Sequence, residues 1–254
     1  MQSSLDKWLV KSNTSLINNK LAHIFYFDNK TGCAEWLDDI EDKCVSLKKE
    51  INWKSMKSNI TICSNLNNNS INEPYNMNIS LVDNLSDKSN IVPFLKSHLQ
   101  KCIRRSLITK SLETAKLLIQ IDFLEFIRRL SIIILEDCIL HESFTKLTWM
   151  IAAYPNWKPN KLDIDWLLGI VKLLAQVEYR DFIQKEHFNF KSNLITINEL
   201  DKDYKGLIYS LYFRVSYGGM KGDMKMLEYF SKIWLERLKE NENKSIELNF
   251  LKSK

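Results

Sequence analysis

The stretch FIRRLSIIILED (residues 126–137) decides the fold class of this 254-residue chain. The run Leu130 to Leu135 within it is almost entirely apolar, yet it is too short to span a bilayer and is followed directly by two acids. A helix that is apolar all round is buried by its neighbours. Because Leu147 to Ala153 has the same character, we expect both segments to lie inside a helical bundle.

Helical periodicity continues on both sides of this stretch. Apolar residues recur at helical spacing in the segments 91–106, 110–121, 123–139, 143–153, 163–187, 202–217 and 222–240. Asp122 is positioned to cap the third segment, and the pair Gly218-Gly219 separates the last two. We therefore predict a mainly α protein, a helical bundle with a small N-terminal α/β or β-hairpin element.

The chain before residue 91 has a different character. The aromatic run Ala22 to Phe27 is typical of a strand, and residues 60–63 and 77–81 are further strand candidates. Between Cys33 and Lys49 the apolar residues recur at helical spacing, which predicts a helix. The sequence thus predicts three regions: a flexible tail over 1–20, a small mixed α/β region with an asparagine-rich loop over 21–90, and a helical domain over 91–254.

Composition narrows the classes of function. The net charge of +5 is mildly basic and permits contact with nucleic acid. No stretch approaches roughly 18 consecutive apolar residues, and the N-terminus lacks the apolar core of a signal peptide, so we expect no membrane association. The five cysteines are scattered without Cys-x-x-Cys spacing, which indicates reduced thiols and neither a zinc site nor another cofactor.

The N-terminus has the spacing of a peptide that binds a sliding clamp. Gln2, Leu5 and Trp8 follow the order Gln-x-x-aliphatic-x-x-aromatic, and Leu9 stands where a second aromatic residue is usual. One helical turn places Leu5, Trp8 and Leu9 on one face, as an apolar plug for a hydrophobic groove. This motif resembles the PIP-box, which binds the proliferating-cell nuclear antigen (PCNA). The resemblance implies a PCNA-like partner for these residues; the alternative is a turn that packs on its own domain.

Two helical segments resemble a known assembly region. Residues Ser97 to Arg105 and the stretch 126–137 are similar to the C-terminal collar of clamp-loader-related AAA+ ATPases of the MgsA/RarA and Werner-helicase-interacting type. The resemblance covers residues 97–153 and implies a helical fold, a replication or repair setting and a homo-oligomer. It does not imply ATPase activity, because the glycine-rich stretch Tyr217 to Asp223 lacks the spacing of a P-loop.

The densest basic group of the sequence overlaps the end of the first collar-like segment. It consists of Lys101, Arg104, Arg105 and Lys110. Lys101 and Arg104 lie three residues apart and share a helical face, so both can reach the same phosphate backbone. We predict these residues as nucleic-acid contacts; the alternative is that they neutralise acids on a neighbouring helix.

Glu136, Asp137, His141 and Glu142 form the best acidic cluster, and Asp137 and His141 lie one helical turn apart. Asp137 and His141 offer donors that suit a divalent metal. The favoured alternative is ion pairing with one of the arginines Arg104, Arg105, Arg128 and Arg129. An acid pair at the end of a buried helix needs such a basic partner.

These features predict a non-enzymatic accessory protein of DNA replication or repair, recruited by a sliding clamp in the nucleus. Two alternatives stay open. The first is an oligomeric structural or assembly protein without a DNA role. The second is a metal-dependent nuclease that uses Glu136 and Asp137, or Asp163 and Asp165, although the latter pair is better explained by the start of a helix. No catalytic residue, metal ligand or cofactor is assigned.

Overall fold

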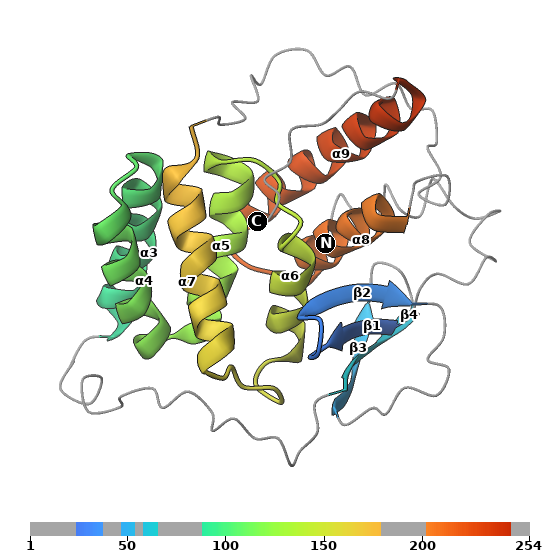
Figure 1. Ribbon diagram of the computed structural model, residues 1–254, viewed down its shortest axis with the longest axis horizontal. Helices are drawn as coiled ribbons and strands as arrows, with labels where there is room; N and C mark the ends of the chain where they lie inside the picture. Colours follow the sequence, from blue (N-terminus) through green and yellow to red (C-terminus); the bar gives the residue numbers. More distant parts are fainter. Residues whose placement is uncertain (1–23, 38–46, 54–57, 66–87, 179–201, 245–254) are drawn as a thin grey trace. The chain divides into compact units, whose positions relative to one another are not determined.

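The computed structural model describes residues 24–37, 47–53, 58–65, 88–178 and 202–244 (Figure 1). They form a mainly α protein with a small sheet near the N-terminus, which confirms the predicted fold class. The helices are α3 (Lys88–Arg104), α4 (Ile108–Ile121), α5 (Phe123–Asp137), α6 (Phe144–Ala153), α7 (Lys161–Gln176), α8 (Lys202–Ser216) and α9 (Lys221–Lys244). None of the helices in these ranges combines the length and the apolar character needed to cross a bilayer.

The sheet contains four strands in the order β2-β1-β4-β3 (Figure 1). They are β1 (Ile24–Asp28), β2 (Cys33–Leu37), β3 (Leu47–Trp53) and β4 (Ser58–Ser64). β1 is antiparallel to β2 and parallel to β4, and β3 is antiparallel to β4. The strands predicted over 22–27 and 60–63 are confirmed as β1 and β4, and the candidate over 77–81 lies outside the described residues.

The helix predicted over residues 33–49 is wrong, because both described ends of that segment are strands. Gly32, with a φ of 72°, turns the chain from β1 into β2, and its N–H donates to the Asp28 carbonyl at 2.8 Å. This hairpin sets Trp36 directly opposite Phe25, and their rings stack with centroids 4.2 Å apart. A cross-strand aromatic pair of this kind stabilises a sheet and outweighs the helical spacing of the local sequence.

The chain folds into two compact units that are interleaved along the sequence. The first, the sheet unit, contains the four strands with α6, α8 and α9. Helix α6 contacts β1, β2, β4 and α8. Its fully buried Trp149 has an indole N–H that lies 3.1 Å from the Phe25 carbonyl oxygen and 3.2 Å from that of Cys63. One side chain therefore ties α6 to two neighbouring strands.

The second, the helical unit, contains α3, α4, α5 and α7. Helix α3 contacts the other three helices, and α4 contacts α5 and α7. The segment Leu130 to Leu135 is buried on all sides, as predicted from its composition. Asp122 caps α5 by accepting the Glu125 N–H at 2.9 Å, which confirms the predicted cap. Helix α7 ends at Gln176, earlier than the predicted residue 187, because the next residue, Val177, has an extended backbone conformation.

Candidate nucleic-acid interface

The predicted site residues fall into two groups. The residues predicted to bind a sliding clamp, Gln2, Leu5, Trp8 and Leu9, lie outside the described residues, so their role stays a prediction. The basic group lies in the helical unit, at the connection between α3 and α4. Lys101 and Arg104 lie in the last turn of α3, Arg105 follows that helix directly, and Lys110 lies in the first turn of α4. We call these four residues the basic corner.

The backbone of the connection fixes the basic corner. The Ser106 N–H donates to the Ile103 carbonyl at 3.0 Å, and the Leu107 N–H donates to the Cys102 carbonyl at 2.9 Å. These two bonds form a Schellman motif that closes α3. Ser106 occupies its left-handed position with a φ of 56°, where glycine is the usual residue. The short, hydrogen-bonded turn brings the end of α3 and the start of α4 together.

Arg104 is held by an acid of helix α5. Its Nε donates to Asp137 Oδ1 at 2.5 Å, and this hydrogen bond raises the pKa of the arginine. The Gln100 amide donates to the other Asp137 oxygen at 2.6 Å and to Glu136 at 2.8 Å. The Asp137 side chain is 5% exposed and that of Arg104 is 50% exposed. The predicted ion pair across the bundle is therefore confirmed for Arg104 and Asp137, and the Arg104 side chain remains half exposed.

The other three members of the basic corner are exposed. Within the described ranges, no carboxylate forms an ion pair with Lys101, Arg105 or Lys110. Burial raises the pKa of the Cys102 thiol, and the charges of Lys110 and Arg105 act in the opposite direction. Three of the four cations of the corner therefore carry charge that no described carboxylate pairs with.

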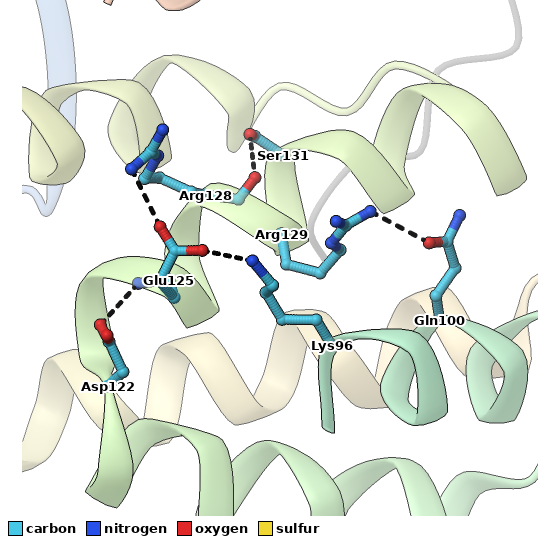
Figure 2. Close-up of polar contacts among 7 residues, drawn as sticks. All are labelled: Lys96, Gln100, Asp122, Glu125, Arg128, Arg129 and Ser131. Atoms are coloured by element: carbon cyan, nitrogen blue, oxygen red, sulfur yellow. Dashed lines mark hydrogen bonds and ion pairs between the residues drawn. The ribbon is translucent and has the colours of Figure 1, made fainter. Parts of the chain in front are cut away.

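A second polar cluster joins α5 to α3 (Figure 2). Figure 2 shows the Glu125 carboxylate between Lys96 of α3 and Arg128 of its own helix. Arg128 donates to Glu125 at 2.9 Å, and Arg129 donates to the Gln100 Oε1 at 3.3 Å. The contacts of Lys96 with Glu125 and of Arg129 with Gln100 join α3 to α5, and the contact of Arg128 with Glu125 lies within α5. Two of the four arginines are therefore explained as parts of the helical unit.

The Lys96–Glu125 pair predicts a pH-dependent stability. Burial acts to raise the pKa of Glu125, but the hydrogen bond and charge of Lys96, with the charges of Arg128 and Arg129, bring it below its ordinary value of 4.5. A lowered pKa stabilises the folded state above pH 4.5, and this stabilisation is lost as the pH falls through the folded-state pKa. The Lys96→Met variant should lose about 1 kcal/mol of unfolding free energy at pH 7 and less at pH 3.

Urea denaturation at both pH values measures this difference. Lys161→Met is the control, because Lys161 pairs with Asp165 in an exposed position on α7 and should contribute little at either pH. Equal losses at pH 7 and pH 3 in the Lys96→Met variant would show that the charge of Glu125 is not the cause.

The remaining acidic candidates have structural roles. Asp163 forms a capping box with Asn160 at the start of α7, as the helix-start interpretation predicted. Asp165 accepts from Lys161 at 2.5 and 2.6 Å. In the part of the chain that the structure describes, no group of three or more histidine, cysteine or acidic side chains is placed to hold a metal ion.

Sequence reasoning missed two residues next to the basic corner. Phe94 of α3 is 65% exposed, and its ring stacks on that of His98 with centroids 5.8 Å apart and an interplanar angle of 17°. His98 Nδ1 lies 2.9 Å from the Thr114 hydroxyl on α4. The signal was present in the sequence, because Phe94, His98, Lys101 and Arg105 recur at the spacing of one helical face.

Comparisons of the chain with protein-family models, with curated proteins and with solved structures find no match. The functional interpretation therefore depends on the chemistry and geometry of the chain's own residues.

Proposed function

We propose that this protein is a non-enzymatic accessory factor of DNA replication or repair. The basic corner contacts the phosphate backbone of nucleic acid, and the N-terminal segment recruits the protein to a PCNA-like sliding clamp at the nuclear site of DNA synthesis. The observation that carries the proposal is the exposure of Lys101, Arg105 and Lys110 at one helix–helix connection.

The charge pattern supports backbone contact. Cations that neutralise phosphates release counterions, so affinity falls with salt by a slope of about 0.7 to 0.9 for each phosphate contacted. Three contacts would weaken binding roughly 20- to 40-fold between 50 and 200 mM salt. Arg104, whose side chain is half exposed, adds a guanidinium next to them, a group that suits bidentate recognition of a phosphate.

Removing the three cations tests the proposal. Fluorescence anisotropy with a labelled oligonucleotide should show that Lys101→Gln, Arg105→Gln and Lys110→Gln together lower affinity at least about 10-fold at low salt and flatten the salt dependence. The charge-matched control replaces Lys172, Lys221 and Lys225, three exposed lysines on α7 and α9, by glutamine. Equal affinities and equal slopes for the two triple variants would overturn the proposal.

The two alternatives have weaker support. A nuclease that used Asp137 would need its carboxylate to leave both Arg104 and Gln100, which now hold its two oxygens. An assembly protein without a DNA role is supported by the collar resemblance alone. This alternative does not explain why the charges of the basic corner are exposed.

A further inference from the structure

The basic corner continues into an aromatic surface along α3. Phe94, His98, Lys101 and Arg105 follow one another at intervals of four, three and four residues. At 3.6 residues per turn these positions fall within about 60° of the helix circumference. We call this face the α3 stripe. Its first half is aromatic and its second half is cationic, and Lys110 of α4 extends the cationic half.

The aromatic half has an unusual exposure. A phenylalanine side chain is normally buried, whereas Phe94 is 65% exposed. Its ring lies nearly parallel to that of His98, at an interplanar angle of 17°. The Thr114 hydroxyl of α4 lies 2.9 Å from His98 Nδ1, and this hydrogen bond at the edge of the ring holds the imidazole. Phe94 therefore presents an exposed ring that stacks on an imidazole held by a hydrogen bond.

The two halves lie within reach of one strand of nucleic acid. A rise of 1.5 Å per residue puts Phe94 about 10 Å from Lys101 along the helix axis, which is about three phosphate spacings of a stacked strand. The cations fit the phosphates, and a flat exposed ring fits the face of a base. A base offers its face only when it is unpaired and unstacked from a neighbour, so duplex DNA cannot use the aromatic half.

We infer that the α3 stripe binds single-stranded nucleic acid, an inference that rests on the proposed function and names its ligand. An unpaired base stacks on Phe94, which His98 supports, and the adjoining phosphates contact Lys101, Arg105 and Lys110. The positive charge of the stripe favours this polyanion over an apolar protein segment, for which the three cations would be a cost. Stacking on an aromatic ring tolerates every base, so binding depends little on sequence.

Anisotropy of labelled oligo-dT, about 16 nucleotides long, and of a duplex of equal length tests the inference with the full chain. Phe94→Ala should weaken single-strand binding about 5- to 100-fold and leave duplex binding unchanged, and Phe94→Tyr should restore it. The control is Leu162→Ala, which removes an apolar side chain that is 68% exposed on α7. Circular dichroism checks that each variant is folded.

The outcomes separate the inference from the proposed function. If Phe94→Ala binds oligo-dT as well as the intact chain while the triple charge variant does not, the stacking site is wrong and backbone contact stands. If the intact chain binds neither the single strand nor the duplex, the proposed function fails as well, and a protein partner becomes the better explanation of the α3 stripe.

Discussion

Replacing both Leu5 and Trp8 with alanine should lower the affinity of the full chain for a sliding clamp by about 100-fold or more. The intact chain is expected to bind with a dissociation constant of about 1 μM, as short motifs that order on binding do. Aromatic and aliphatic anchors in a groove typically carry about 2 kcal/mol or more each, and the two changes remove both. Surface plasmon resonance with an immobilised clamp measures the loss.

The matched control lies in the same segment. Leu16→Ala with Ile17→Ala removes two apolar side chains outside the motif and should leave clamp affinity within about twofold, because those positions are not anchors. If the Leu5 and Trp8 variant binds as tightly as the intact chain, the resemblance to a PIP-box has no functional meaning here.

The largest loss of stability is expected from Trp149→Ala in helix α6. The side chain is fully buried and stacks on Phe27 with ring centroids 4.8 Å apart. Its removal leaves a cavity and two carbonyl groups, on β1 and β4, without the indole donor. We expect the free energy of unfolding to fall by about 3 to 5 kcal/mol, measured by urea denaturation followed by far-UV circular dichroism.

Trp149→Phe separates the contribution of ring packing from that of the indole hydrogen bonds. This variant keeps a ring against Phe27 and removes the N–H, so it should lose about 1 to 3 kcal/mol, less than the alanine variant. A loss below about 1 kcal/mol in the alanine variant would show that α6 is not tied to the sheet through this residue.

Local signals in the sequence were sufficient to predict the helices of the described chain. Asp122 and Asn160 cap α5 and α7 through hydrogen bonds to residues three positions away, so each cap is encoded in a short segment. Gly218 and Gly219 have φ of 93° and 158°, which favour glycine, and they separate α8 from α9. This signal is also local, because it depends on two adjacent residues. Burial of the 130–135 run follows from composition alone.

Features that depend on distant residues were not predictable in this way. Strand β2 exists because Trp36 meets Phe25 across a hairpin and donates to Ser210 Oγ of α8 at 3.1 Å. The contact between His98 Nδ1 and the Thr114 hydroxyl likewise depends on how α3 and α4 pack against each other. The interleaving of the sheet unit and the helical unit also follows from packing between segments far apart in the sequence.

The contact between Arg104 and Asp137 has a consequence for the entropy of recognition. A free arginine on a surface samples many rotamers, and a ligand that fixes it must offset that lost freedom. Here the contact with Asp137 has already restricted the guanidinium, while the Arg104 side chain as a whole is half exposed. An incoming anion would meet one donor that is already oriented, so the adjustment on docking would be confined to the flexible lysines and Arg105 around it.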